Sequence, residues 1–330
     1  MRTISKSVLT TIVLLSLPGL AFAADKAIFG SDDRLDFYEA PRGIQDLSDS
    51  VVSLWKSEDV KANPETGRYD LNTTRLGLAV ALCPGNRYWL QRTGSYCTGS
   101  LVGPDLVLTA GHCIKNAQDC ANARIVFGFK VDKDGDPGPD SLDRREVYGC
   151  SSIVRRYVHP DSIGADFALI KLDRKVAGHK PLFINRGDQV REGKKIFTIG
   201  YPTGLPLKVA VNARVTDARM CEAFVTDLDG FAGNSGGPVF NASTRKIEGV
   251  LVRGLKDYKF SYGCTHAVTY PETDADEEAT LISEVAPYIP LLPGEEPQGS
   301  GAAGYANVKV NSMSGAEPLR MPPDFNGSRR

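Results

Sequence analysis

The chain has 330 residues, of which 42% are apolar, and its 39 Lys and Arg against 40 Asp and Glu leave a formal net charge of −1. This length and apolar content fit one or two soluble globular domains with a substantial core. A near-neutral charge provides no electrostatic footprint for nucleic acid, so a nucleic-acid partner is not expected.

The N-terminus has the pattern of a secretory leader. Arg2 and Lys6 precede an apolar run over residues 8–17, and the small-residue triplet Ala21-Phe22-Ala23 follows. The run is shorter than the ~20 apolar residues of a membrane-spanning helix, and no later stretch is long enough. We therefore predict a signal peptide over residues 1–23 and an exported protein, secreted or periplasmic, with no membrane insertion of the mature chain.

Short apolar or alternating runs, separated by turn residues, recur from residue 76 onward. They cover residues 100–110, 123–131, 166–172, 194–202, 205–215, 222–228, 246–254 and 264–270. Many short strands at this spacing predict an all-β sandwich or barrel and not alternating βα units. We accordingly predict an N-terminal segment over residues 24–75 and a β domain over residues 76–292.

A single helix is predicted near the end of the chain, over residues 274–289. Asp274 and Glu277 form a cap-like pair, and a set of apolar residues falls on one helical face. That set is Leu281, Ile282, Val285, Tyr288 and Ile289. The following residues are rich in Gly, Pro, Ser and Glu, which predicts a disordered tail over residues 293–330.

The loop after residue 131 has a partial calcium-binding pattern. Asp132, Asp134 and Asp136 alternate, but Pro137 stands where a calcium loop requires glycine, and no glutamate closes the motif. A solvated hairpin loop over residues 133–143 is the better interpretation. Because the four histidines are scattered and no Cys-x-x-Cys occurs, we expect no metal site and no cofactor.

A candidate nucleophile lies in the stretch GFAGNSGGPVF, residues 230–240, where Ser235 precedes two glycines. Serine is a weak nucleophile unless a base and an oxyanion site accompany it. His112 follows an apolar run in LTAGHC, and Asp166 begins the run DFALIKL. These three side chains therefore occur in the order His, Asp, Ser, each at the edge of a predicted strand.

The blocks YCTGSLVGPDLVLTAGHC, VHPDSIGADFALIKL and GNSGGPVF resemble the three signature blocks of trypsin-like serine peptidases. The resemblance spans about residues 76–292 and implies two six-stranded antiparallel β-barrels with a C-terminal helix. It also implies that Ser235 attacks the scissile carbonyl, His112 takes its proton and Asp166 orients the imidazole. The backbone N–H groups of Gly233 and Ser235 would form the oxyanion hole.

Asn234 takes the position where animal members of the family keep an aspartate that pairs with a newly released N-terminal amine. An amide cannot supply that charge, so the chain resembles the bacterial branch that includes glutamyl endopeptidases. The segment AIFGSDDR, residues 27–34, is similar to the mature start of that branch. We therefore predict a short propeptide over residues 24–27 and a second trim near residues 26–28.

Substrate specificity is assigned by the same resemblance. Asp229 falls where trypsins place the carboxylate that binds Arg or Lys, and this favours cleavage after basic residues. Leu251 replaces the histidine through which the glutamyl branch binds a carboxylate, and Arg253 could neutralise Asp229 or contact an acidic side chain instead. The full set of candidate pocket residues is Asp229, Gly230, Leu251, Val252, Arg253 and Gly254.

In an oxidising compartment, seven cysteines indicate disulfides. The resemblance implies a Cys97–Cys113 bridge beside the catalytic histidine. Cys120 and Cys150 flank one predicted strand and are expected to pair. Cys221 and Cys264 bracket the serine block and are also expected to pair, which would leave Cys83 unpaired.

The leading hypothesis is thus an exported, monomeric serine endopeptidase that acts on proteins or peptides. One alternative is a catalytically silent relative that uses the same barrels as a binding module, and another is a glutamyl-specific endopeptidase. An esterase of the α/β-hydrolase class is disfavoured because no βα pattern surrounds Ser235.

Overall fold

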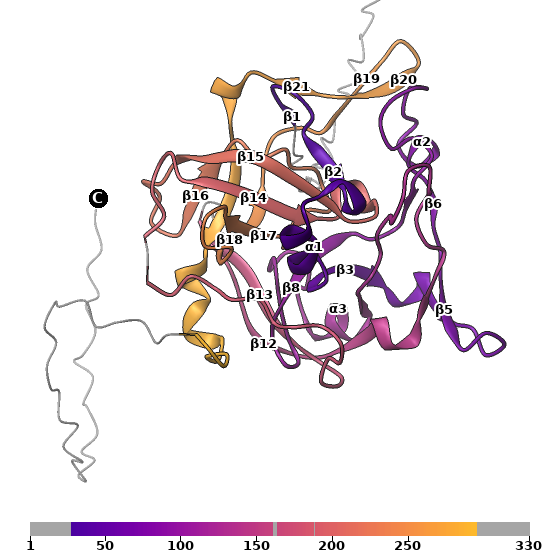
Figure 1. Cartoon of the computed structure of the whole chain (residues 1–330), viewed down its shortest axis with the longest axis horizontal. Helices are drawn as coiled ribbons and strands as arrows, with labels where there is room; N and C mark the ends of the chain where they lie inside the picture. Colours follow the sequence, from indigo (N-terminus) through magenta and orange to yellow (C-terminus); the bar gives the residue numbers. More distant parts are fainter. Residues whose placement is uncertain (1–27, 161–163, 188, 296–330) are drawn as a thin grey trace, which may run out of the picture. The chain divides into compact units, whose positions relative to one another are not determined.

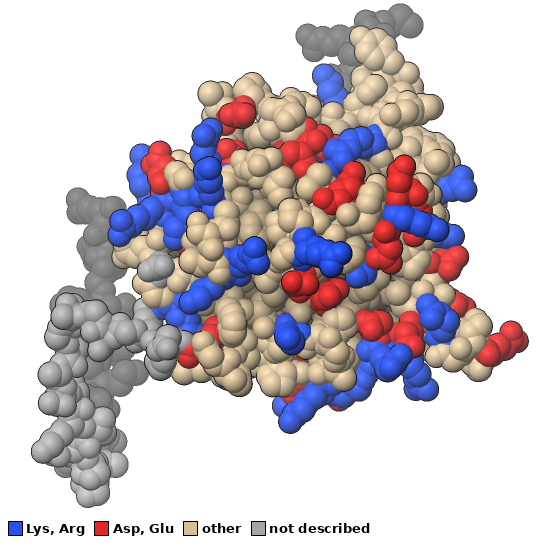
Figure 2. Space-filling view, in the orientation of Figure 1, with Lys and Arg blue, Asp and Glu red and all other residues tan. Residues whose placement is uncertain are grey.

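The computed structural model describes residues 28–160, 164–187 and 189–295. The predicted signal peptide, the short propeptide and residues 296–330 of the predicted tail lie outside the described residues. On the face seen in Figure 2, positive and negative side chains are interspersed, in keeping with the net charge of −1. None of the helices in the described ranges is long and apolar enough to span a membrane.

Six antiparallel strands close the first barrel (Figure 1). In spatial order they are β10 (Ala123–Val126), β12 (Val147–Val158), β13 (Asp166–Leu172), β9 (Leu106–Thr109), β8 (Cys97–Gly103) and β3 (Val51–Lys56). β3 pairs with β10 and so completes the ring. The strands present buried aliphatic side chains to the interior, as β-branched and Leu-rich strands do when one face is buried.

A second ring of six antiparallel strands forms the other barrel. The order is β14 (Lys195–Gly200), β17 (Pro238–Asn241), β18 (Ile247–Arg253), β22 (Glu277–Leu281), β16 (Ala223–Thr226) and β15 (Lys208–Asp217), and β15 pairs back with β14. β2 (Arg34–Asp36) adds a seventh strand on the outer edge of β15. The predicted double barrel is therefore confirmed.

Short strands, helices and 3₁₀ turns connect the barrel strands or lie outside the two barrels. The remaining strands are β1 (Ile28–Phe29), β4 (Val60–Ala62), β5 (Arg68–Leu71), β6 (Thr74–Arg75), β7 (Arg92–Thr93), β11 (Ser141–Asp143), β19 (Tyr258–Ser261), β20 (Cys264–Ala267) and β21 (Thr269–Tyr270). The helices are α1 (Arg42–Ser48), α2 (Leu76–Ala79) and α3 (Ala117–Ala121), with 3₁₀ turns η1 (Phe37–Glu39), η2 (Ser57–Asp59), η3 (Arg144–Glu146), η4 (Pro202–Gly204), η5 (Glu272–Asp274), η6 (Ile282–Glu284) and η7 (Ala286–Tyr288).

The two barrels share one apolar cluster, which holds their inner surfaces together. Leu54 and Leu108 of the first barrel belong to the same cluster as Phe197 and Phe240 of the second. A polar contact reinforces this junction, because the hydroxyl of buried Tyr201 donates to the backbone oxygen of Val51 at 2.9 Å. The strand ends that carry the candidate site are therefore fixed by packing from both sides.

The predicted helix over residues 274–289 is wrong. Residues 277–281 form strand β22, Asp274 ends the 3₁₀ turn η5, and the 3₁₀ turns η6 and η7 follow the strand. Pairing of β22 with both β16 and β18 overrides the local helical pattern. The apolar residues Ile282, Val285 and Ile289 are still buried, in or directly beside the two 3₁₀ turns.

The first barrel also begins earlier in the chain than expected. β3 lies in the segment over residues 24–75, where the sequence predicted only an extension before a domain that starts at residue 76. Five of its six residues are buried, so its sequence lacks the apolar–polar alternation that marks a half-exposed strand. The strand was therefore not recognised within a largely polar segment.

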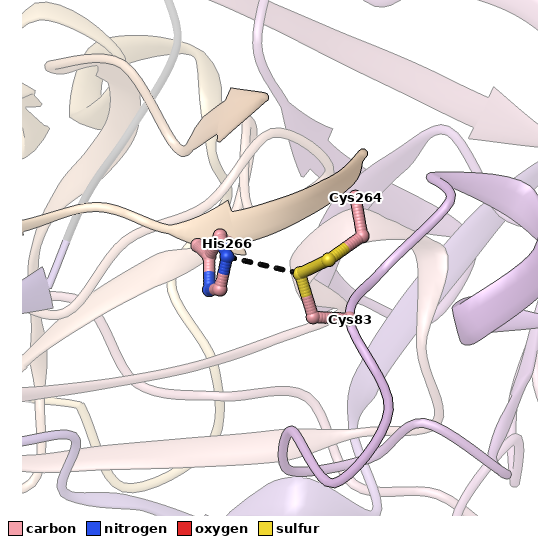
Figure 3. A group of neighbouring side chains, drawn as sticks. All are labelled: Cys83, Cys264 and His266. Carbon is pink, nitrogen blue, oxygen red and sulfur yellow. Dashed lines mark hydrogen bonds between the residues drawn. A yellow bond between two sulfur atoms is a disulfide. The ribbon is translucent and has the colours of Figure 1, made fainter. Parts of the chain in front are cut away.

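The disulfides agree with the prediction in two cases and differ in the third. Cys97 is bonded to Cys113 and Cys120 to Cys150, as expected. Cys264 is bonded to Cys83 (Figure 3). Cys221, its predicted partner, is instead an exposed free thiol. The bridge fastens β20 to the loop after α2, and this long-range approach has no signature in the sequence.

Candidate active site

His112 and Asp166 meet because two adjacent strands bring them together. β9 ends three residues before His112, β13 begins at Asp166, and the two strands pair antiparallel. Nδ1 of His112 lies 2.7 Å from Oδ2 of Asp166, and the backbone N–H of His112 donates to Oδ1 at 3.1 Å. The carboxylate thus fixes both the ring and the backbone of His112, and it holds the proton on Nδ1 so that Nε2 is the basic nitrogen.

The carboxylate of Asp166 is buried but stays ionised. Burial alone would raise its pKa, but hydrogen bonds and charge from His112 outweigh that effect and bring the pKa of Asp166 below its ordinary value. A residue that the sequence reasoning missed supports this strand end. The hydroxyl of Thr280, on β22, accepts from the N–H of Asp166 at 2.9 Å and donates to its carbonyl at 3.1 Å.

Ser235 comes from the second barrel and docks against the first. Its carbonyl oxygen accepts from the N–H of Thr98 on β8 at 2.9 Å and lies 3.7 Å from Sγ of Cys113. Cys113 is the neighbour of His112 in the chain, so the serine loop sits beside the histidine. The Cys97–Cys113 bridge therefore forms part of the surface on which the serine loop rests.

The residue two before the serine adopts a backbone conformation that requires glycine. Gly233 has φ of 97°, and a Cβ there would lie 2.5 Å from the carbonyl oxygen of Tyr201. Thr98 donates through its hydroxyl to the Gly233 carbonyl at 2.7 Å. In the part of the chain that the structure describes, the N–H groups of Gly233 and Ser235 donate to no protein acceptor.

Asn234 lies deep inside the second barrel. It is 3% exposed, and its Oδ1 packs against the backbone of Gly200, where an added Cβ would lie 2.5 Å away. Its N–H donates to the carbonyl of Phe231 at 2.9 Å, which shapes the turn that leads to Ser235. The side chain at this position is thus a neutral amide in a buried setting.

Asp229 does not serve as an open pocket carboxylate, contrary to the expectation. Oδ1 accepts from the N–H of Phe29 at 2.8 Å and Oδ2 accepts from the N–H of Asp33 at 3.0 Å. Burial raises the pKa of Asp229 to about 7 despite these two bonds. Both carboxylate oxygens are therefore used to anchor the N-terminal segment.

Three other candidate pocket residues are likewise engaged in contacts with the protein itself. Arg253 donates through Nε and Nη2 to Glu278 at 2.9 and 2.7 Å, and through Nη2 to the carbonyl of Gly164 at 2.6 Å, so its guanidinium is engaged away from Asp229. Leu251 and Val252 are both buried, Leu251 in a smaller apolar cluster of the second barrel and Val252 in the cluster that the two barrels share. The Leu251 backbone bonds to the glycines that follow Ser235 and thereby fastens the serine loop to β18.

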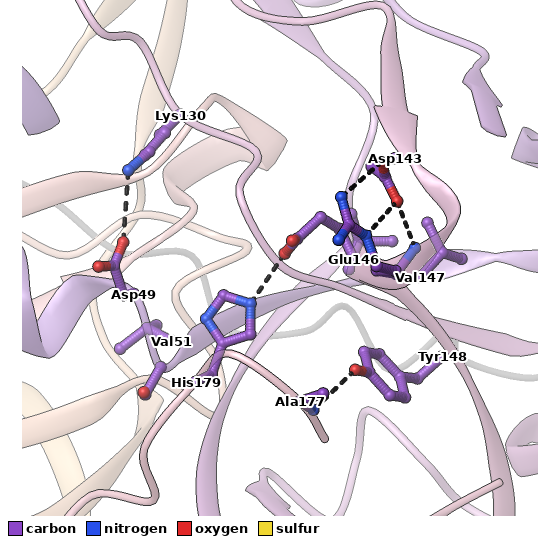
Figure 4. A network of polar contacts seen from close by, with 12 residues as sticks. Asp49, Val51, Lys130, Asp143, Glu146, Val147, Tyr148, Ala177 and His179 are labelled. Atoms are coloured by element: carbon purple, nitrogen blue, oxygen red, sulfur yellow. Dashed lines mark hydrogen bonds and ion pairs between the residues drawn. The ribbon is translucent and has the colours of Figure 1, made fainter. Parts of the chain in front are cut away.

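The remaining histidines take other roles. Nε2 of His179 lies 2.9 Å from Oε2 of Glu146 (Figure 4), and the ring stacks on Phe127. Nε2 of His266 lies 3.0 Å from Sγ of Cys83 (Figure 3). Cys83, Cys264 and His266 are close enough to share a metal ion, but two of their sulfurs are joined in a disulfide. A disulfide sulfur is not the thiolate that metal binding requires.

Comparisons with known proteins agree on one family. A family model described as "Trypsin-like peptidase domain" matches residues 97–250. "Serine protease ea" of Drosophila melanogaster is 25% identical over 198 residues, which cover 47% of this chain and 50% of that protein. "Trypsin Blo t 3" of Blomia tropicalis is 25% identical over 213 residues, which cover 55% of this chain and 73% of that protein. The match to the Drosophila relative thus spans half of that relative's length.

Two solved structures are also similar. The first, titled "Structure of Glu endopeptidase in complex with MPD", is 18% identical, has a TM-score of 0.44 and covers 80% of this chain and 97% of its own. The second, titled "Structure of Vibrio cholerae VesB protease", is 15% identical, has a TM-score of 0.47 and covers 78% of this chain and 66% of its own.

Proposed function

Because residues 97–250 match the trypsin-like peptidase domain and the similar curated proteins are serine proteases, we propose that the chain is an endopeptidase that cleaves peptide bonds through Ser235, His112 and Asp166. The observation that carries this proposal is the 2.7 Å contact between Nδ1 of His112 and the buried carboxylate of Asp166. That contact supports a role for Asp166 in orienting the imidazole, so that Nε2 of His112 is the nitrogen left to face Ser235.

Catalysis would proceed in two half-reactions. Nε2 of His112 accepts the proton of Ser235 as its oxygen attacks the scissile carbonyl, and Asp166 stabilises the imidazolium that forms. The imidazolium then protonates the leaving amine, which departs and leaves an acyl-enzyme. A water molecule, deprotonated by the same imidazole, hydrolyses the ester and regenerates Ser235.

The oxyanion of each tetrahedral intermediate would accept from the N–H groups of Gly233 and Ser235. Gly233 supports this role because its positive φ turns the backbone at a position where a side chain would collide with Tyr201. Donors that are in place before the reaction need no reorganisation as charge develops, which is why such holes lower the barrier strongly.

The substrates would be proteins or peptides outside the cytoplasm. The enzyme would act as a monomer and would need no cofactor. The three disulfides within the described residues support export, because such bonds persist in oxidising compartments. We propose basic residues, Arg or Lys, at the cleaved position on the resemblance to trypsins, and not on Asp229, whose two oxygens accept from the N–H groups of Phe29 and Asp33. Removal of a leader over residues 1–23 and a trim near residues 26–28 would precede activity.

A fluorophosphonate probe tests the proposal directly. The processed protein should be labelled at Ser235, and the Ser235→Ala variant should lose labelling together with roughly 10⁶-fold of kcat. Cysteine-directed alkylation of the exposed thiol Cys221 checks that equal amounts of chain are compared. A wild-type protein that binds peptides but is never labelled would instead be a silent binding module.

A further inference from the structure

Asp166 lies on a strand of the first barrel, but the backbone just before it is bonded to the second barrel. Nη2 of Arg253 donates to the carbonyl oxygen of Gly164 at 2.6 Å. The N–H of the next residue, Ala165, donates to Oε2 of Glu222 at 2.9 Å. Gly164 and Ala165 are both buried, which strengthens hydrogen bonds at this position. Side chains of the second barrel therefore fix the backbone that carries the carboxylate of the first.

The side chains that reach across come from three adjacent strands or their ends. β18 ends with Arg253, and its partner in register on β22 is Glu278. Thr280, whose hydroxyl bonds to the backbone of Asp166, lies two positions further along β22 and so points to the same side of that strand. Glu222 directly precedes β16, which pairs with the other edge of β22. The second barrel thus presents a group of neighbouring polar side chains to the start of β13.

Glu278 directs the guanidinium of Arg253 toward Gly164. Nε and Nη2 of Arg253 donate to Oε2 of Glu278 at 2.9 and 2.7 Å, and the two side chains are 16% and 21% exposed. The planar guanidinium can serve a carboxylate and a carbonyl at once, in a fixed geometry that an ammonium group lacks. Gly164 also permits the close approach of Glu222, because an added Cβ there would lie 2.7 Å from Oε2. Both contacts therefore depend on the particular residues present.

The same strand also holds the serine loop. On β18, the backbone N–H of Leu251 donates to Gly237 at 2.9 Å, and its carbonyl accepts from Gly236 at 2.7 Å. Arg253 lies two positions further along this strand and bonds to Gly164. One strand of the second barrel is thus bonded both to the loop of the nucleophile and to the segment that leads into the acid.

We propose that Arg253 and Glu222 are positioning residues that hold Asp166 in register with the barrel that carries Ser235. This inference rests on the proposed function. Arg253 and Glu222 act through Asp166, whose carboxylate must meet Nδ1 of His112, and a misplacement of about 1 Å costs up to ~10²-fold in rate. Loss of either contact should therefore slow the chemical step without weakening substrate binding.

The first experiment replaces the guanidinium. Arg253→Met keeps most of the apolar stem and removes all donors, so kcat for a peptide substrate should fall by about 10–100-fold while KM stays within about twofold. The rate constant of fluorophosphonate labelling should fall by a similar factor, because this small probe reports the reactivity of Ser235. Arg253→Lys, which keeps the charge but not the planar fork, should fall between the two.

Arg174→Met is the matched control at the other end of β13. Arg174 also pairs with an acid, Asp173, at 3.0 Å, and it donates to the carbonyl of Val147 at 2.8 Å. The control therefore removes the same kinds of bond from the same strand, far along the chain from Asp166. Its kcat and labelling rate should match those of the wild-type protein.

The second experiment separates the two forms of the Glu222 side chain. Glu222→Gln keeps an oxygen that accepts from the N–H of Ala165 and should retain most of the wild-type kcat, whereas Glu222→Leu should lose about 10-fold or more. Proton NMR gives a signature that needs no turnover. The proton between Nδ1 of His112 and Asp166 lies in a short charge-assisted bond and should give a downfield signal, which Glu222→Leu should shift or broaden and Glu222→Gln should preserve.

The outcomes separate the two proposals. Absence of fluorophosphonate labelling in the wild-type protein rejects the proposed function, and the NMR comparison then still decides whether Glu222 positions Asp166. Normal labelling with a wild-type kcat in Arg253→Met rejects only the positioning role. A raised KM at unchanged kcat would assign Arg253 to substrate binding and would also reject that role, as would an equal loss of kcat in Arg174→Met. If Arg253→Met does not fold, a wild-type kcat in both Arg253→Lys and Glu222→Leu rejects the role.

Discussion

The two barrels share a topology but differ in what they bury. Within the described residues, Asp166 is the one buried charged side chain on a strand of the first barrel. The second barrel buries Lys208, Glu248 and Glu277 on its strands, and Asp229 and Asp257 in its loops. One barrel is thus held by apolar packing and the other combines packing with buried charges.

This difference matches the work assigned to each barrel. The first barrel holds one histidine and one carboxylate at a fixed distance, and dense apolar packing fixes the strands that carry them. The second barrel carries the serine loop and several buried charges, and each buried charge costs stability because it leaves water. Outside the serine loop, changes at the buried charges of the second barrel should therefore affect stability, whereas a change at Asp166 in the first barrel should affect the chemical step.

The largest effect should come from the single buried charge of the first barrel. Asp166→Asn keeps the shape of the side chain but favours the wrong imidazole tautomer, so kcat should fall by about 10⁴-fold. KM should stay within a few-fold, because Asp166 does not touch substrate. Steady-state kinetics with a Lys peptide measures both. A variant that retained a tenth of the wild-type kcat would contradict the assigned role.

Glu248 tests whether the charges of the second barrel bear on stability. Its carboxylate accepts from Asn241 and Asn185, each at 2.7 Å, and lies 3.1 Å from Nζ of Lys194. Glu248→Ala removes a common partner of all three, and it should reduce the free energy of unfolding by about 3–5 kcal/mol.

Leu108→Ala is the matched change in the first barrel, where a cavity should cost about 2–5 kcal/mol. Urea unfolding compares the two variants, and activity per labelled molecule should be unchanged for Glu248→Ala. If Glu248→Ala lost less than about 1 kcal/mol, the contrast between the barrels would not extend to stability.

Gly233→Ala probes the junction between the barrels. An added methyl group would meet the carbonyl of Tyr201 and would have to accept φ of 97°. The turn should therefore shift and displace one oxyanion donor, with a loss of about 10²–10³-fold in kcat. Gly193→Ala is a useful control, because Gly193 also has a positive φ but nothing lies within 4 Å of its added Cβ. Equal losses in the two variants would exclude a specific effect on the oxyanion site.

The sequence predicts the proposed triad better than the proposed specificity pocket. His112, Asp166 and Ser235 each stand at a strand edge inside a local motif, so a few neighbouring residues suffice to propose them. Asp229, in contrast, contacts backbone groups 200 and 196 positions away, which no local pattern encodes. Strand β22 was not predicted either, because the spacing of apolar residues after its start indicated a helix where the sheet recruits a strand.

The smallest expected effect is a pH dependence of the free energy of unfolding, and it comes from Lys208 on the edge strand β15 of the second barrel. Nζ of Lys208 lies 2.7 Å from Asp36 of the N-terminal segment, and burial lowers the pKa of Lys208 to about 8 although Asp36 opposes the shift. Between pH 8 and the ordinary value of 10.5, the unfolded chain binds this proton more tightly than the folded one. The contribution of Lys208 to the free energy of unfolding should therefore rise with pH across this window.

Lys208→Met, which keeps the length of the side chain without its charge, should lose that slope, and urea midpoints at pH 7.5, 9 and 10 would measure it. Lys246→Met, at a half-exposed position directly before β18, should behave like the wild-type protein. If Lys208→Met and the wild-type protein changed in parallel over this range, Lys208 would keep an ordinary pKa. In that case pairing with acidic groups, and not burial, would determine the pKa values of the charged side chains inside the second barrel.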